Sequence, residues 1–512
     1  MELIKNNIHM NKIKRNINTQ ITVNDDIILP EENIDINYIV ASDAYAVIDS
    51  TKIKDGRITL KGRLCFKTLY GDSARLQNLS GEIPIDEVLY SDNVNEDDCL
   101  TVYLKVDNSN ISIINNRKIS IHCIVNASIT SENLYDIETT SDIERDDMCM
   151  QKESAEILQI AECKKDILRL KKELEINKES PEISELLWDT VNLYNTDIQL
   201  ESDSISITGN ICITYLYKTD DKNSIEWQSE TIPFSETLPV SNVDSSMIAD
   251  VLLLPMSYNI QTKNNQDGET RLIDLDLTYS VNIKVYKEIT TYYIKDIYST
   301  KSIVTPILNH VCYNTLVMKN LAKCKINDKF VISKNGSKIL QICGNTADLS
   351  LDTINKSENG IIVSGTLTVN LMYVSGDDSM PINIVKEAAP FTHTIEVNDN
   401  LSDTNISIRP YIEQISTTMA GTNEIDIKAT IALDTLVIKN TEADMVTSYN
   451  EETFDMNSLV NVPSIICYIA KENDTLFSIA KQFRTTIDEL KNINNLSDHI
   501  SKGEMITIIK QC

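Results

Sequence analysis

The sequence lacks most of the short motifs that mark catalytic and metal-binding sites. It has no Cys-x-x-Cys pair, no His-Glu-x-x-His and no Gly-x-x-x-x-Gly-Lys-Ser/Thr loop. Structural zinc needs closely spaced cysteine or histidine ligands, and nucleotide phosphates bind the backbone of that glycine-rich loop. Only five histidines occur in 512 residues. We therefore expect no catalytic residues, no metal site and no bound cofactor, and a protein that is not an enzyme.

The chain also has little positive charge and no long apolar run. Its 47 Lys and Arg residues stand against 76 Asp and Glu residues, so the formal net charge is −29. An acidic surface repels the phosphates of nucleic acids and anionic lipid headgroups. Apolar runs such as residues 251–256 are far shorter than the roughly 20 residues of a membrane-spanning helix. We expect no nucleic-acid partner and no transmembrane segment.

Cysteines and acidic clusters are present, but they lack the spacing of known sites. The eleven cysteines are scattered without close pairs, which argues against a disulfide framework. The first 18 residues are polar and basic and lack the apolar segment of a signal peptide. Residues 96–98 and 144–147 are acidic but do not have the ligand spacing of a calcium loop. These features favour a protein kept in a reducing cytosol, with a solvated acidic surface.

One alternating pattern occurs three times along the chain, at residues 58–70, 205–217 and 361–373. Apolar residues fall at every second position, which is the period of a β-strand with one buried face. A glycine lies on the apolar face, and a tyrosine follows eight residues later on the same face. These pairs are Gly62 and Tyr70, Gly209 and Tyr217, and Gly365 and Tyr373. A glycine inside a strand usually marks a bulge or a close approach of another backbone.

Each repeat continues with a proline-containing strand and then with a long alternating strand. Because proline donates no hydrogen bond to a strand ladder, we expect edge strands or strand starts at Pro84, Pro233 and Pro390. The long alternating segments are residues 119–130, 273–285 and 425–437, and extended segments at 21–29, 174–183 and 330–339 open the repeats. Two packed antiparallel sheets per repeat would bury one apolar face of each sheet.

The segments between the repeats have a different composition. Residues 152–175 are highly charged and contain no glycine or proline. Their apolar residues do not keep a heptad spacing, so we interpret the segment as a docked helix rather than a coiled coil. A weaker helical pattern runs over residues 307–322. Residues 442–464 are polar and acidic with a late proline, which is typical of a linker.

The sequence thus predicts a mostly β protein. It would contain three tandem antiparallel β-sandwich-like repeats with short helical connections, and a small C-terminal α+β domain of β-α-α-β order. The expected parts are a polar N-terminal arm over 1–19, repeats over 20–150, 173–322 and 323–446, a helical connection over 151–172, a linker over 447–467 and a last domain over 468–512.

The last domain carries the clearest local signals. Asp474 or Thr475 can cap a helix, because a side-chain oxygen accepts hydrogen bonds from the free N–H groups of the first turn. Apolar residues then follow at helical spacing from Leu476 to Phe483. A second short helix is expected over residues 486–493, with Thr486 as its cap, and a strand over 505–509 follows the turn at Gly503.

Residues 468–509, in this order, resemble the LysM domain, a β-α-α-β module best known for binding glycans that contain N-acetylglucosamine. The family usually has glycine where this chain has Asn473, and asparagine is the residue that best tolerates the left-handed backbone in its place. The resemblance implies a groove between two loops. Its residues would be Asn473, Asp474, Thr475 and Leu476 on one side and Asn494, Leu496 and Ile500 on the other. Alternatively, Asp474 and Thr475 only cap the helix and Leu476 only fills the core.

The three repeats resemble the domain repeated in clostridial spore coat proteins. Three such repeats followed by a LysM domain are the layout of the SipL-like family of spore coat morphogenetic proteins. The resemblance implies a scaffold in the mother-cell cytoplasm that gathers at the forespore surface, in the spore coat. Its partners would be the ATPase of the coat's basement layer (SpoIVA-like), bound through the LysM domain, and other coat proteins. The alternatives are a peptidoglycan-binding protein of the cell wall or cortex and an enzyme with a site hidden in the repeats.

Overall fold

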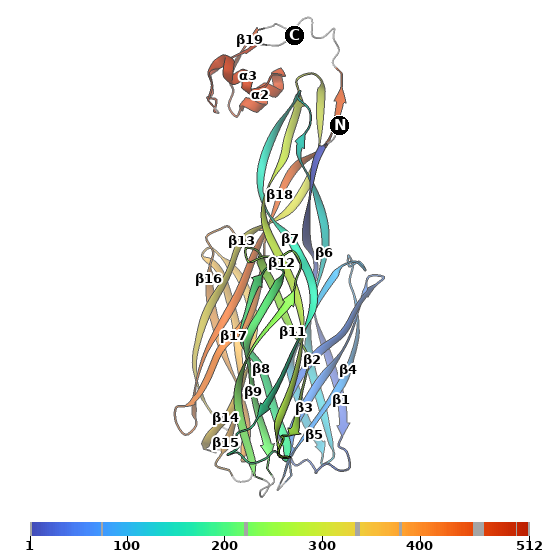
Figure 1. Cartoon of the computed structure of the whole chain (residues 1–512), viewed down its shortest axis with the longest axis vertical. Coiled ribbons are helices and arrows are strands. Elements are labelled where there is room, and N and C mark those ends of the chain that lie inside the picture. Colours follow the sequence, from blue (N-terminus) through green and yellow to red (C-terminus); the bar gives the residue numbers. More distant parts are fainter. Residues whose placement is uncertain are drawn as a thin grey trace.

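The computed structural model describes residues 3–72, 75–219, 224–332, 338–377, 381–453, 465–497 and 499–509. Strands make up nearly all of the described chain up to Glu452, and two short helices follow in the C-terminal domain. Strands β1–β18 form three units of six consecutive strands each, which we call unit 1 (β1–β6), unit 2 (β7–β12) and unit 3 (β13–β18). The mostly β fold with a small C-terminal α+β domain is therefore confirmed (Figure 1).

Each unit contains two three-stranded antiparallel sheets. In unit 1 these are β2 (Tyr38–Lys54), β3 (Arg57–Gly71) and β4 (Leu76–Tyr90), and β1 (Leu3–Ile28), β6 (Lys118–Ile143) and β5 (Cys99–Asn115), with β3 and β6 central. Unit 2 repeats this order with β8 (Glu185–Glu201), β9 (Ser204–Lys218) and β10 (Ile225–Pro239), and β7 (Met148–Glu175), β12 (Thr270–Ser299) and β11 (Ile248–Asn264). Unit 3 repeats it with β14 (Ile339–Ser357), β15 (Gly360–Ser375) and β16 (Ile382–Glu396), and β13 (Ile303–Val331), β18 (Glu424–Glu452) and β17 (Thr404–Met419).

The alternating segments of the sequence are the central strands of these sheets. The glycine-to-tyrosine segments lie in β3, β9 and β15, and the long alternating segments lie in β6, β12 and β18. Pro84, Pro233 and Pro390 lie in β4, β10 and β16, which are all edge strands, so this prediction is confirmed. A central strand uses its N–H groups toward both neighbours, whereas an edge strand tolerates a residue that has none.

Each repeated glycine lies opposite a bulge in the neighbouring strand. The register shifts in β2 opposite Gly62, in β8 opposite Gly209 and in β14 opposite Gly365. A Cβ atom on Gly62 would lie 2.3 Å from the carbonyl oxygen of Val47, and the same distance separates a Cβ on Gly365 from a carbonyl oxygen of β14. On Gly209 it would lie 2.9 Å from the ring of Phe234. The bulge and the close approach are both confirmed, since only glycine leaves this space free.

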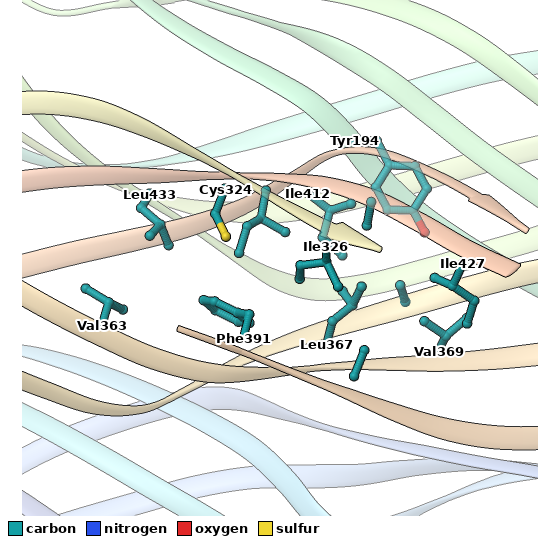
Figure 2. Close-up of a cluster of buried hydrophobic side chains, with 14 of the residues drawn as sticks. Tyr194, Cys324, Ile326, Val363, Leu367, Val369, Phe391, Ile412, Ile427 and Leu433 are labelled. Atoms are coloured by element: carbon teal, nitrogen blue, oxygen red, sulfur yellow. The ribbon is translucent and has the colours of Figure 1, made fainter. Parts of the chain in front are cut away.

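The two sheets of each unit enclose a hydrophobic core. Figure 2 shows the core of unit 3, where side chains of β15 and β16 meet side chains of β13, β17 and β18. Tyr194 of unit 2 reaches into the same core, so units 2 and 3 pack against each other there. The repeated Tyr70, Tyr217 and Tyr373 are at most 2% exposed. Burial of a large apolar side chain contributes about 1.5–3 kcal/mol, which makes these positions major anchors.

The three units pack against one another around a shared centre. Leu69, Leu216 and Met372, which directly precede the three tyrosines, belong to one cluster of buried residues. Beside it, the ammonium of Lys67 in unit 1 lies 4.8 Å from the centre of the Trp188 ring of unit 2. The same ammonium lies 3.0 Å from the carboxylate of Asp189. Aromatic and charged groups of unit 2 thus replace the water that this largely buried lysine loses.

One long ribbon from each unit extends beyond its sheets, and the three ribbons form a stalk (Figure 1). The stalk comprises residues 3–13 with 132–143, 148–160 with 286–299, and 303–316 with 438–452. Its core contains two sets of residues at equivalent repeat positions: Ile8, Ala155 and Val311, and Met10, Ile157 and Tyr313. Each ribbon enters the stalk at a bulge, and these bulges also lie at equivalent positions, Lys14, Ala161 and Val317.

The prediction of a helix over residues 152–175 is wrong, because these residues belong to strand β7. On one face Ile157 packs into the stalk core, while on the other Leu158 and Ile160 pack against units 2 and 3. Burial of both faces and the bulge at Ala161 together remove the alternation that marks a strand in sequence. The helical connection over 151–172 is therefore the first strand of unit 2.

Three further boundaries also differ from the prediction. The residues expected to form a polar arm over 1–19 enter strand β1 at Leu3, and Ile8 and Met10 lie in the stalk core. The helical pattern over 307–322 belongs to β13, the first strand of unit 3. Strand β18 continues to Glu452, inside the predicted linker, and residues 454–464 lie outside the described residues.

Candidate functional site

The C-terminal domain has the strand-helix-helix-strand order expected from the sequence. It consists of β19 (Ile465–Ile469), α2 (Leu476–Phe483), α3 (Ile487–Asn494) and β20 (Met505–Ile509), and the two strands pair antiparallel. The first strand begins three residues before the expected start. Ile479, Ala480, Leu490, Ile506 and Ile508 form a core with no measurable exposure. The helices cover one face of the two-stranded sheet.

Both helices begin at capping residues that the sequence suggests. Thr475 caps α2, where its hydroxyl oxygen accepts from the N–H of Ser478, and Thr486 caps α3 in the same way. Each cap is a capping box, which satisfies two N–H groups that a helix start leaves free. Arg484 and Asn495 end the helices in left-handed conformation. The predicted role of Thr475 as a cap is confirmed.

The loop before α2 is one side of the predicted groove. Asn473 is exposed and has a φ of 73°, the left-handed conformation for which the family uses glycine. A carboxylate oxygen of Asp474 accepts hydrogen bonds from the N–H of Lys471 and the hydroxyl of Tyr468, both at 2.8 Å. These hydrogen bonds, chiefly the one from the Lys471 N–H, lower the pKa of Asp474. The carboxylate thus stays ionised and holds the turn in shape.

The loop after α3 is the other side of the groove. The amide of Asn494 donates to the carbonyl oxygen of Thr507 and accepts from its N–H, both at 2.7 Å, so Asn494 fastens the loop to β20. Leu496 and Ile500 are half-buried and pack in the same cluster as the buried Leu476. The structure therefore brings the two predicted loops together on one core. Asn473, Thr475, Leu496 and Ile500 keep exposed surface there, whereas Leu476 is mainly core.

A contact that the sequence did not indicate holds this domain against the stalk. The ring of Tyr298, near the end of β12, meets the ring of Phe477 edge to face at 5.2 Å. Its hydroxyl donates to the carbonyl oxygen of Thr485 at 2.7 Å. Lys481 forms an ion pair with Asp296 at 2.5 Å. No short motif could have revealed it, because the partners lie almost 200 residues apart in the chain.

The docking contact uses one side of α2 and leaves the predicted groove free. Tyr298, Phe477 and Thr485 are at most 8% exposed, as expected for the centre of an interface. Asn473 and Thr475 at the start of the same helix remain exposed. The domain is thus fixed at the end of the stalk (Figure 1), and the loop before α2 keeps exposed residues.

The described residues contain neither a metal-binding cluster nor a membrane-spanning helix. Among the described residues, no group of three or more His, Cys, Asp or Glu side chains could hold a metal ion. In that same part of the chain, no helix combines the length and the apolar character needed to cross a membrane.

Comparison with known protein families identifies two kinds of domain. The family model described as SipL, SPOCS domain matches residues 35–114, 182–260 and 338–420, and the LysM domain family matches residues 468–508. The three SPOCS matches begin before β2, β8 and β14 and end in or after β5, β11 and β17. Strands β6, β12 and β18, which are central in the sheets that extend into the stalk, therefore lie outside the matches. No curated protein and no solved structure matches the chain. Both families are binding or structural domains, one sporulation-associated and one of the peptidoglycan-binding type.

Proposed function

The chain is a SipL-like protein with three SPOCS domains and a C-terminal LysM domain, and on this premise we propose that it is a non-enzymatic adaptor of the spore coat. In this function the LysM domain binds the ATPase of the coat's basement layer (SpoIVA-like). The SPOCS units position that domain and contact other coat proteins. The adaptor acts in the mother-cell cytoplasm and attaches the coat to the forespore surface.

The position of the LysM domain is the observation that carries this proposal. The domain lies at the end of the stalk, where Tyr298 and the ion pair between Lys481 and Asp296 hold it. The three SPOCS units share packed clusters of buried residues and support the stalk from the other end (Figure 1). The three units share buried clusters, so the body holds the LysM domain in a fixed position and orientation. An adaptor needs this arrangement, because it must hold its partner at a defined place.

The proposed contact surface consists of the two loops of the groove, Asn473–Leu476 and Asn494–Ile500. Asn473 and Thr475 are exposed, and the half-buried Leu496 and Ile500 pack in one cluster with Leu476, which follows Thr475 in the chain. Interfaces combine partly apolar centres with polar rims in this way. Asp474 and Asn494 use their polar atoms within the domain, so we assign them to shaping the loops.

The acidic body suits partners with basic surfaces. The chain carries a net charge of −29, whereas residues 468–512 contain six basic and six acidic side chains, so the excess lies in the SPOCS part. Two such bodies repel each other when packed side by side in a layer. Basic coat proteins between the bodies would neutralise this charge.

Capture of the purified ATPase by the full-length chain tests the proposal. The double substitution Asn473→Arg and Leu496→Arg should reduce capture at least tenfold, because it places two long charged side chains on the contact surface. Gln482→Arg, at an exposed position of α2 outside the two loops, is the matched control and should retain capture. Equal capture by all three proteins would exclude the two loops as the binding surface. If the unsubstituted chain captured no ATPase, that partner itself would be excluded.

The LysM match also favours a second candidate function, binding of peptidoglycan in the cortex or cell wall. Sedimentation with purified peptidoglycan separates the two functions. The adaptor function predicts that the full-length chain stays in the supernatant. Cosedimentation that depends on Asn473 and Leu496 would establish the glycan-binding function instead.

A further inference from the structure

The LysM domain has an apolar sheet face that no helix covers. In β19 and β20 the side chains alternate, so that Ile506 and Ile508 are buried against the helices. The opposite face, which we call the outer face, presents five apolar side chains and the half-buried Thr507. The five apolar side chains are Ile465 at 64% exposure, Ile469 at 63%, Met505 at 67%, Ile509 at 43% and the exposed Cys467.

These side chains form a continuous surface because the strand register places them side by side. Ile465 is paired with Ile509 and Ile469 with Met505, while Cys467 and its partner Thr507 lie between these two pairs. Soluble proteins rarely leave a contiguous apolar face open to water, and such a face usually marks an interaction site. The outward backbone groups of β20 are already occupied at Thr507 by Asn494. A partner is therefore bound by the face and not by strand addition along β20.

Charge and position decide which occupant fits this face. The five side chains are uncharged, and the LysM domain is charge-balanced, whereas the SPOCS body carries the whole excess negative charge. Two copies of this chain repel each other wherever their bodies approach. The LysM domain lies at one end of the long molecule, and β19 lies on the side of the domain away from the body (Figure 1). Copies that meet tip to tip keep their bodies apart by much more than the roughly 8 Å over which charges act at physiological salt.

We propose that the outer face binds the outer face of a second copy of this chain, and that the two copies form a tip-to-tip dimer. A two-fold axis pairs the same patch on both copies, so each isoleucine of one sheet packs on the other. Two sheets packed in this way lie about 10 Å apart. The patch has far fewer residues than the roughly 20–30 per partner of a standard interface, so the dimer is weak and depends on chain concentration.

This inference does not depend on the proposed adaptor function. The outer face shares no residue with the groove loops Asn473–Leu476 and Asn494–Ile500, and the stalk contacts α2 rather than the sheet. Self-association and capture of the ATPase can therefore succeed or fail separately.

The test is the mass of the full-length chain in solution, measured by light scattering over a concentration series with reductant present. The unsubstituted chain should shift from the 57.7 kDa of one chain to twice that mass. The double substitution Ile469→Lys and Met505→Glu should weaken the dimer at least tenfold. These two residues are cross-strand partners, so the substitution keeps the net charge and allows an ion pair that retains the hairpin. Melting temperature and circular dichroism verify that the variant folds.

The control is Ile28→Lys with Tyr90→Glu, two body positions that are 71% and 75% exposed, and it should dimerise like the unsubstituted chain. A single-chain mass up to about 1 mM, near the weak limit of specific affinity, overturns the proposal. Equal dimerisation of the folded Ile469→Lys, Met505→Glu variant overturns it as well, and so does a mass that grows beyond two chains. If the chain stays monomeric and this variant instead loses capture of the ATPase, the outer face serves a different protein and the dimer is excluded.

Discussion

The repeated glycines connect a sequence pattern to a physical cause at the scale of single residues. Glycine recurs because its neighbours on both sides leave no space for a side chain. The bulged strand brings a carbonyl oxygen close to Gly62 and to Gly365, and a phenylalanine ring of the opposite edge strand lies close to Gly209 and Gly365. Three different strands show the same bulge at the same repeat position. The glycine was visible in the sequence, but its neighbour was not, because the bulged strand has no sequence signature of its own.

These contacts predict unequal costs for the same substitution. Gly62→Ala should lower the free energy of unfolding by about 2–3 kcal/mol, because its Cβ meets a backbone carbonyl at 2.3 Å. Gly209→Ala should cost only about 1 kcal/mol, since its nearest neighbour is the ring of Phe234, which can shift. Denaturant unfolding measures both values. Gly376→Ala, where the nearest atom lies at 3.8 Å, is the control and should change stability by less than about 0.5 kcal/mol. Equal losses at Gly62 and Gly209 would contradict this explanation.

Asn473 shows how far a single residue could be predicted in the candidate site. The sequence predicts a left-handed turn there, and the observed φ of 73° agrees. The capping role of Thr475 is equally local and was also predicted. The hydrogen bonds of Asn494 to Thr507 were not predicted, because they join an amide side chain to a strand 13 residues further on.

At the scale of elements, strand β7 shows why a pattern can mislead. Its charged residues and absence of glycine are typical of a helix, yet it pairs with β12 along its whole length. Where the ribbon enters the stalk, Ile157 faces one core and Leu158 another, so neighbouring residues are both buried. Tertiary packing on both faces therefore outweighs local propensity. The same bulge recurs at Lys14 and Val317, and the helical pattern noted near Val317 is wrong for the same reason.

The docking of α2 on β12 predicts how the LysM domain moves. Tyr298→Ala should remove about 3 kcal/mol of docking free energy, because the edge-to-face ring contact and the hydrogen bond to Thr485 are both lost. The LysM domain should then tumble independently, with sharper amide resonances than in the unsubstituted chain. Tyr298→Phe keeps the ring and should cost only about 1 kcal/mol. Unchanged relaxation of LysM amides in Tyr298→Ala would mean that other contacts hold the domain.

At the scale of the whole molecule, the three units depend on one another. The cluster around Leu69, Leu216 and Met372 takes residues from all three, and so does the stalk core. A unit separated from the others would expose these side chains to water. A tandem array of independent domains does not have this property, because its contacts remain within each domain.

This interdependence predicts a single cooperative unfolding transition for the SPOCS body. Leu216→Ala should cost about 2–5 kcal/mol and shift the melting of all three units together, although the residue belongs to unit 2 alone. Scanning calorimetry should give a calorimetric enthalpy close to the van 't Hoff value for the body. Three separate transitions, of which only one moves in Leu216→Ala, would show that the units fold independently.

The sequence by itself determined what depends on neighbours within a few residues. Strict alternation fixed the central strands, prolines marked the edge strands, and caps at Thr475 and Thr486 fixed the LysM helices. Tertiary structure alone decided that three ribbons join into a stalk, that the charged segment of β7 is a strand, and that Tyr298 holds the LysM domain at the tip. These features arise from contacts between residues one hundred or more positions apart, and their free energy exists only once the distant surfaces have met.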